Sequence, residues 1–302
     1  MMNQRCRQNG INVNRSTVAL IQSHLDPVSV QCRKRNRLRR RKYYSRDPNY
    51  VWHIDGYDKL KPYGFPIHGA IDGFSRFILW LNVCKSNKDP KTPCTLFLNY
   101  ADMVDGVPEK IVSDRGTENV YIAASQRFLR RSEGSFVYER YVSNQRNESW
   151  WSTNWWINFF RDIVNSGIYD LTDNVHVECA KFCFGILIQN DLEKIRESWN
   201  NHRIRRSINT NDQYRSSGIP SIIYSTPSIL GNVVDYKHPL MQQEKDAVRE
   251  VCCTTLENRF FCSENFYLLA TIIMSENDLQ NPNTVEEGVH LFDNLILLLN
   301  QI

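Results

Sequence analysis

The chain has 302 residues, enough for one large domain or two smaller ones, and its hydrophobic content of 41% can fill a sizeable core. No apolar run approaches the roughly eighteen residues that a membrane-spanning helix needs, so we expect no membrane partner. The net charge of +4 is unevenly distributed: residues 1–42 carry eleven lysines or arginines and one acid, whereas residues 241–302 carry three basic and ten acidic residues. A basic front of this kind predicts a polyanionic partner.

Nine cysteines are scattered along the chain, and an odd number in a long chain argues against a disulfide framework. A reducing compartment, the cytosol or the nucleus, fits better. Cys179 and Cys183 follow His176 closely, which is the best case for a metal cluster among the cysteines. No second pair completes a zinc site, so we predict that these cysteines are core residues of a helix.

The N-terminal segment, residues 1–32, contains a short candidate helix from Thr17 to His24. Asn14 or Ser16 can cap its start, and Pro27 lies just past its end. Such a helix fits the recognition helix of a partial, truncated helix-turn-helix unit, although a simple amphipathic helix fits equally well.

A basic run follows in the segment 33–48, which we interpret as a linker. The run is interpreted as a nucleic-acid-binding patch, as a nuclear import signal or as both. The alternative is a solvated linker without a specific function. Its density of positive charge favours DNA contact and a nuclear location. The predicted DNA-binding residues in this run are Arg33, Lys34, Arg35, Arg37, Arg39, Arg40, Arg41 and Lys42.

From residue 51 the pattern changes to strands, which begin a unit with the order βββαβαβα. The expected strands cover 51–58, 65–73, 76–86, 110–114 and 136–142. The expected helices cover 92–105, 117–131, 143–164 and 171–206. The fold class is therefore α/β, with a mixed five-stranded sheet flanked by helices and with helical extensions at both ends. A polar linker at 207–235 separates this unit from an acidic, partly helical extension at 236–302, where we expect two helices, around 240–252 and 286–302.

Three carboxylates stand out in this unit. Asp55 interrupts an apolar strand, Asp114 ends the fourth strand, and Glu148 lies near the start of the next helix. In a βββαβαβα fold the first and fourth strands are neighbours, so Asp55 and Asp114 can approach each other, and the helix can deliver Glu148. Converging carboxylates repel each other unless cations are present, and hard oxygen ligands suit Mg²⁺ or Mn²⁺. Two such ions can activate an attacking oxygen and stabilise a leaving one in phosphodiester chemistry.

The motifs WHIDG, IDGFSR, SDRGTEN and NQRNESWW together resemble the catalytic core of retroviral integrases and related DDE transposases. They look most like the integrase-core proteins of eukaryotic transposable elements. The resemblance covers about Tyr50 to Arg206, and we assign 49–206 to the catalytic core. It implies an RNase H-like fold, two divalent ions, nicking of DNA ends and transfer of the 3′ hydroxyl to a target phosphate. The catalytic and metal-binding acids of the family map onto Asp55, Asp114 and Glu148.

The chain departs from retroviral integrases at both ends of this core. It shows no N-terminal His-His-Cys-Cys zinc unit and no obvious small β-barrel after the core. We therefore expect the segments that bind DNA in those enzymes to be absent or replaced.

Other residues near the motifs have alternative roles. We expect Glu118 to lie in the first turn of a helix, with a supporting role in the site as the second interpretation. We predict that Asp72 is a turn residue. Asn144 and Arg146 contact a DNA phosphate or cap the helix that follows. Trp151, Trp155 and Phe159 recur at i, i+4 and i+8, which predicts core packing, whereas Trp150 and Trp156 fall off this stripe and are open to partner contact.

These observations predict a DNA strand transferase or endonuclease of the DDE type that uses two Mg²⁺ or Mn²⁺ ions. DNA is the expected partner, a homo-multimer is the expected active form, and we expect no small-molecule cofactor. The alternative is a domesticated, non-catalytic DNA-binding protein that retains the same fold.

Overall fold

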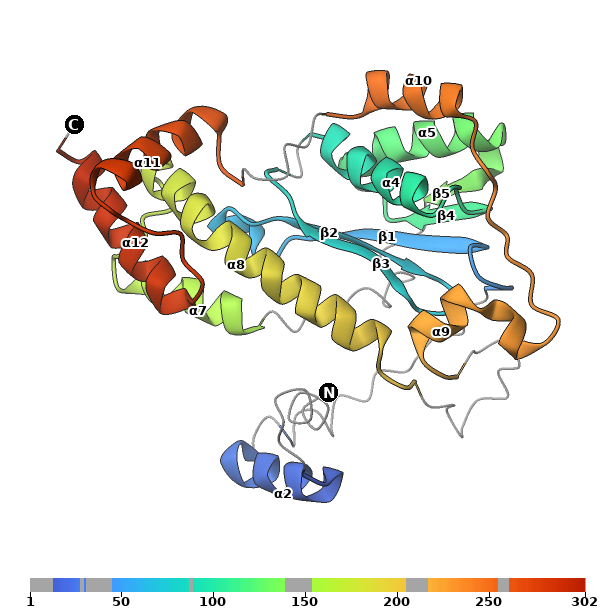
Figure 1. Cartoon of the computed structure of the whole chain (residues 1–302), viewed down its shortest axis with the longest axis horizontal. Coiled ribbons are helices and arrows are strands. Elements are labelled where there is room, and N and C mark those ends of the chain that lie inside the picture. Colours follow the sequence, from blue (N-terminus) through green and yellow to red (C-terminus); the bar gives the residue numbers. More distant parts are fainter. Residues whose placement is uncertain are drawn as a thin grey trace.

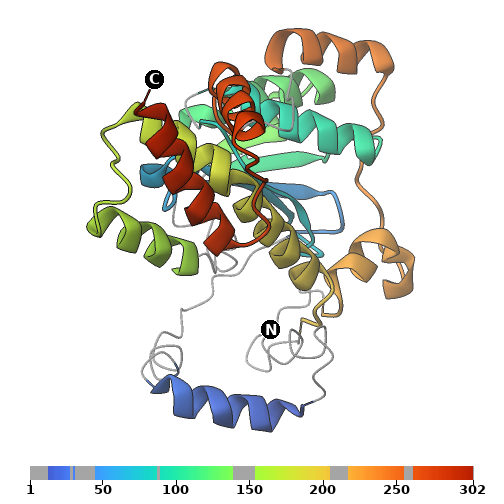
Figure 2. The same ribbon diagram turned by 60° about the vertical axis from the view of Figure 1, so that its left-hand side comes forward.

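The computed structural model describes residues 13–27, 30, 45–86, 89–138, 154–204, 217–254 and 261–301. Across these ranges, no helix combines the length and the apolar character that a bilayer span requires. Helix α2 (Arg15–Leu25) is capped by Asn14, whose side chain accepts a hydrogen bond from Ser16 N, as the sequence predicts. Figure 2 shows this helix apart from the remaining elements.

A five-stranded sheet forms the centre of the molecule (Figure 1). Its strands are β1 (Val51–Tyr57), β2 (Ile67–Asp72), β3 (Ile78–Val83), β4 (Lys110–Ser113) and β5 (Phe136–Tyr138). The spatial order is β3-β2-β1-β4-β5, with the first three strands antiparallel and with β4 and β5 parallel to β1. This confirms the predicted mixed sheet, its βββαβαβα order and the adjacency of the first and fourth strands, and it is the arrangement expected of an RNase H-like fold.

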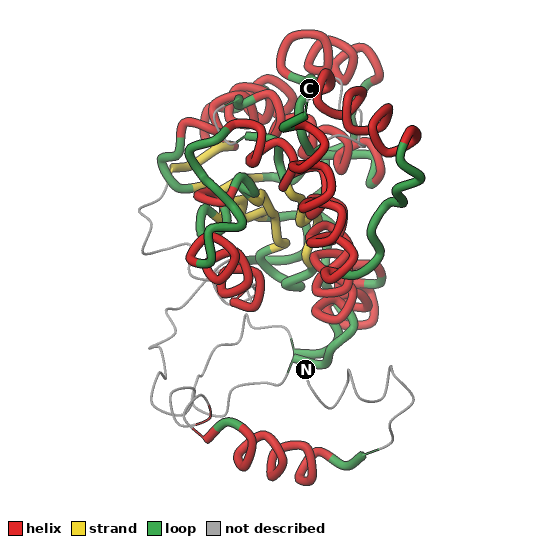
Figure 3. The backbone as a smooth tube through the Cα atoms, turned by 90° about the vertical axis from the view of Figure 1, so that its left-hand side faces the viewer, coloured by secondary structure: helices red, strands yellow, loops and turns green. Residues whose placement is uncertain are grey.

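Helices cover both faces of the sheet, so the strands are enclosed between two helical layers (Figure 3). One layer contains α4 (Lys91–Met103), α5 (Val120–Arg130) and α10 (Gln242–Cys252). The other contains α7 (Asn154–Asn165), α8 (Asn174–Asn200), α11 (Glu264–Glu276) and α12 (Val285–Leu299). The short helix α9 (Pro220–Ser225) follows α8, and single 3₁₀ turns cover Lys61–Tyr63, Thr117–Asn119, Glu133–Ser135 and Pro227–Leu230.

Alternation along β1 explains why both faces are covered. Trp52 and Ile54 point into the cluster beneath α4 and α5, whereas Tyr57 belongs to the cluster beneath α7 and α8. Cys179 and Cys183 are fully buried in the second cluster, which confirms the prediction that they are core residues of a helix.

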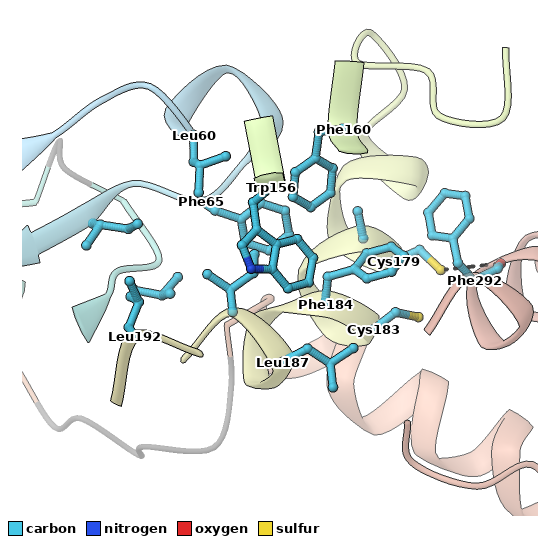
Figure 4. Close-up of a cluster of buried hydrophobic side chains, with 14 of the residues drawn as sticks. Leu60, Phe65, Trp156, Phe160, Cys179, Cys183, Phe184, Leu187, Leu192 and Phe292 are labelled. Atoms are coloured by element: carbon cyan, nitrogen blue, oxygen red, sulfur yellow. Dashed lines mark hydrogen bonds between the residues drawn. The ribbon is translucent and has the colours of Figure 1, made fainter. Parts of the chain in front are cut away.

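The buried face of α7 differs from the predicted one. Trp156 is 3% exposed and Phe160 is fully buried, whereas Trp155 is 54% exposed. Phe160 stacks on Phe65 at 4.9 Å between ring centroids and meets Phe184 edge-on at 5.7 Å (Figure 4). The expectation that Trp155 packs in the core and that Trp156 is free for a partner was wrong, because several aromatic stripes compete on this helix and α8 selects the one that it covers. Trp150 and Trp151 lie outside the described residues.

The C-terminal segment completes both hydrophobic clusters. Val248 of α10 and Cys253 join the cluster beneath α4 and α5. Phe292 and Leu295 of α12 join the cluster around α8, where Cys179 Sγ donates a weak hydrogen bond of 3.8 Å to Phe292 O (Figure 4). The described part of this segment holds three helices where two were expected, and it packs against the helices that cover the sheet.

Candidate active site

Asp55 lies within β1, and Asp114 directly follows the last residue of β4, the strand that pairs with β1 in parallel. The β1–β4 register pairs Val51 with Lys110 and His53 with Val112. Continued for two residues, it sets Asp55 opposite Asp114. Paired residues of adjacent strands point to the same side of a sheet, and such strands run roughly 4.8 Å apart. The two carboxylates therefore share one face of the sheet, with Asp55 7% exposed and Asp114 partly exposed.

The other predicted site residues lie outside the described residues. This applies to the third predicted acid, Glu148, and to the two residues before it, Asn144 and Arg146. It also applies to the whole basic run: Arg33, Lys34, Arg35, Arg37, Arg39, Arg40, Arg41 and Lys42. Their assignments remain predictions from the sequence.

The turn after β4 holds the Asp114 carboxylate. Its Oδ1 atom accepts a hydrogen bond of 3.1 Å from Gly116 N and one of 3.4 Å from Ser113 Oγ. Both donors are local, so the turn itself orients this carboxylate.

Glu118 is a further acid of the same turn. It lies in the 3₁₀ turn that precedes α5, and its carboxylate folds back over Gly116, so that a Cβ atom there would collide with it. Burial raises the pKa of Glu118, and the negative charges of Asp114 and Asp58 raise it further, while Lys61 opposes them. The sequence predicted that Glu118 lies at the start of a helix. Its carboxylate comes close to Asp114 because the side chain turns back over Gly116.

A buried chain of hydrogen bonds supports the turn from the α4–α5 side of the sheet. Trp80 Nε1 donates to His68 Nδ1 at 3.0 Å, and His68 Nε2 contacts Asn119 Oδ1 at 3.2 Å. Asn119 Nδ2 then donates to Ser113 Oγ at 2.8 Å and more weakly to Glu118 Oε1 at 3.5 Å. Burial lowers the pKa of His68 from 6.5 to about 4, so its ring is neutral at physiological pH.

His68 and Asn119 were missed by sequence reasoning. The available signal was His68 itself, a polar side chain inside the apolar run of the second strand, where it is fully buried. The role of Asn119 could not be predicted from the sequence, because an asparagine at the start of a helix is usually interpreted as a helix cap.

The acids suit a hard divalent cation. Asp55, Asp114 and Glu118 offer carboxylate oxygens, the ligands that Mg²⁺ and Mn²⁺ prefer. Within the part of the chain that the structure describes, no three His, Cys, Asp or Glu side chains form a complete metal-binding cluster. The described acids can therefore supply some of the ligands of such a site, and a further ligand would complete it.

Comparison with known families agrees with this geometry. The model of the integrase core domain matches residues 42–218, which is more than half of the chain. A search of curated proteins found no match. The matched range contains all five strands of the sheet and both Asp55 and Asp114. The chain belongs to the integrase core domain family.

Proposed function

We propose that the protein is a DDE-type polynucleotidyl transferase that nicks DNA and joins DNA ends, as the enzymes of transposable elements do. The observation that carries the proposal is the parallel pairing of β1 and β4, whose register, continued two residues beyond His53 and Val112, sets Asp55 opposite Asp114. Family membership supports the reaction class.

The proposed roles follow from position. Asp55 and Asp114 would hold divalent ions on the shared face of the sheet, and Glu148, which the resemblance gives as the third acid, would supply a further ligand. Two bound ions would activate the attacking oxygen and stabilise the leaving oxygen. Asp55 is buried in a strand and Asp114 is held by Gly116 N, so both carboxylates are oriented before DNA arrives.

The remaining proposals concern partners. The basic run at 33–42 binds the phosphate backbone of DNA and directs the protein to the nucleus. The joining of two DNA ends requires at least two sites, so we propose a homo-multimer as the active form. Light scattering with and without DNA ends tests this assembly.

Metal-dependent nicking and strand transfer on labelled duplex DNA test the function. Wild type, Asp114→Asn and Asp246→Asn are compared with Mg²⁺ or Mn²⁺, and EDTA is added as a control. Asp246 is an exposed acid of α10, so its variant controls for the loss of one negative charge. We expect wild type and Asp246→Asn to cut and join DNA and Asp114→Asn to do neither.

Two results would contradict this expectation. Cutting by Asp114→Asn at the wild-type rate would show that DNA cleavage does not depend on this site. DNA binding by wild type without metal binding or cutting would favour a non-catalytic DNA-binding protein built on the same fold.

A further inference from the structure

The hydrogen bonds from Trp80 to Asp114 have a single consistent direction. An indole nitrogen only donates, so His68 Nδ1 must accept from Trp80. The proton of the neutral ring then lies on Nε2, which donates to Asn119 Oδ1.

This bond in turn fixes the orientation of the Asn119 side chain. With Oδ1 facing His68, Nδ2 faces Ser113 Oγ and donates to it. Ser113 Oγ, having accepted that bond, directs its own proton toward Asp114 Oδ1. The last acceptor of the chain is thus the carboxylate to which we assign metal binding.

Burial protects the chain from water. His68, Asn119 and Ser113 are fully buried, and Trp80 is 4% exposed. Buried polar side chains are costly unless every partner is in place, and connected networks of them stiffen the structure around them. A network that ends at the turn of Asp114 therefore restricts the orientation of that turn.

Gly56 lies beside this network in the sheet. His68 is directly opposite Gly56 in the β1–β2 register, and β1 separates β2 from β4. Paired residues share a face, so a larger side chain at position 56 would extend on the same face as His68, on the strand between His68 and β4.

We propose that His68 and Asn119 are positioning residues, which touch no substrate but hold Asp114 and Glu118 in the orientation that binds a divalent ion. This inference rests on the proposed function, because it requires a metal site at Asp114. It adds a residue from β2, far from the acids in sequence, to the set on which that site depends.

Metal affinity of the full chain without DNA tests the role of Asn119. Mg²⁺ and Mn²⁺ binding is measured by titration calorimetry for wild type, Asp114→Asn, Asn119→Ala and the matched control Asn200→Ala. Asn200 is also a buried asparagine, and its amide bonds to Ile78 N and O on β3, away from the site. We expect Asn119→Ala to weaken metal binding roughly 10- to 100-fold, the usual cost of losing a group that orients a metal ligand. Asn200→Ala should lower the melting temperature to a similar degree and leave metal affinity unchanged.

Two substitutions of His68 separate positioning from packing. Glutamine places a donor near the position of Nε2 and keeps the bond to Asn119, whereas asparagine places its polar atoms near Nδ1 and loses that bond. Both lose ring volume. Positioning predicts that His68→Gln retains metal affinity and that His68→Asn loses it, whereas a purely structural role predicts equal affinity in the two variants.

A measurement on the folded wild type covers the case in which a variant fails to fold. Mg²⁺ is titrated while nitrogen NMR follows the His68 ring and the Asn119 amide, and we expect both signals to shift together with metal binding. Asp114-dependent metal binding with no such shift, or with unchanged affinity in Asn119→Ala and His68→Asn, would overturn this inference alone. Failure of wild type to bind metal in an Asp114-dependent way would overturn the proposed function and this inference together.

Discussion

Asn119 donates a hydrogen bond of 2.8 Å from its side-chain amide to Ser113 Oγ, which ties the end of β4 to the turn before α5. The turn between these residues contains Asp114, Gly116 and Glu118. Because its two ends are joined through buried side chains, small changes inside the turn should act on the proposed metal site before they affect the fold.

Gly116→Ala tests this expectation. The backbone at Gly116 has φ −64° and ψ 140°, which alanine adopts without strain, but the added Cβ would displace the Glu118 carboxylate. We expect metal affinity to fall about 10-fold while the free energy of unfolding changes by less than about 1 kcal/mol. Titration calorimetry and urea unfolding measure the two quantities. Gly134→Ala is the control, because a Cβ there would meet nothing nearer than 3.9 Å. Equal metal affinity in both variants would show that Glu118 has no part in the site.

Asp72→Asn should destabilise the fold without a specific effect on catalysis. The buried Asp72 carboxylate accepts bonds from Asn49 N, Phe74 N, Ser75 N and Ser75 Oγ, in the turn that the sequence predicted. An amide cannot accept all four, so we expect a loss of about 2–4 kcal/mol in urea unfolding at pH 7.5. Asp89→Asn, which alters an exposed turn acid bonded to Lys91 N, should cost less than about 0.5 kcal/mol. A similar small loss in both variants would contradict the assigned role of Asp72.

His68 should make the fold sensitive to acid. Its folded-state pKa is about 4 against 6.5 when unfolded, so the unfolded chain binds a proton first as the pH falls. Its contribution is complete above about pH 6.5 and is lost progressively toward pH 4. Between pH 7.5 and 4.5, wild type should lose about 2–3 kcal/mol more than His68→Gln in urea unfolding.

Asp72 acts in the opposite sense, because burial raises its pKa to about 6 and its proton stabilises the fold as the pH falls. It is present in both proteins and cancels in the difference. Parallel pH profiles for wild type and His68→Gln would contradict the assigned neutral, buried state of His68.

Phe292→Ala tests whether the C-terminal segment belongs to the fold. Phe292 is 1% exposed and contacts Tyr169 and Phe184, so its truncation should cost about 3–5 kcal/mol. Leu297→Ala on the same helix removes a side chain that is 62% exposed and should cost less than about 0.5 kcal/mol. Thermal and urea unfolding give both values. A negligible cost at Phe292 would show that α12 is not needed for stability.

Replacement of the eight basic residues of 33–42 by glutamine tests the predicted DNA contact. Each phosphate contact contributes roughly 0.9 to the slope of log affinity against log salt. We expect a shallower slope for the variant in fluorescence anisotropy and unaltered Mg²⁺ binding. An unchanged slope would assign the run to nuclear import or to a solvated linker.

Much of the fold was predictable because it is encoded locally. The alternation in β1 and β2, the turn at Asp72 and the strand ending at Asp114 are each visible within ten residues. The pairing of β1 with β4 followed from the order of the elements. Face selection on α7 was not predictable, because Trp155 and Trp156 are equally apolar and only the position of α8 decides between them.

The supporting network of the site and helix α11 were missed for physical reasons. His68 meets Asn119 through the pairing of strands that are distant in sequence, which no local pattern encodes. Helix α11 is apolar on most sides, with Leu268 and Ile272 each 56% exposed, so it shows no clear stripe with a helical period.

The packing of α10 on α4 and α5, and of α12 on α8, has a consequence for synthesis. A ribosome releases the strands and the acids of the site well before it releases Val248 and Phe292, which complete the two clusters. The two hydrophobic clusters therefore remain incomplete while Asp55 and Asp114 are already made. Both clusters are complete only after Phe292 and Leu295 have emerged, so a chain interrupted before Phe292 would leave apolar side chains around α8 accessible to chaperones and proteases.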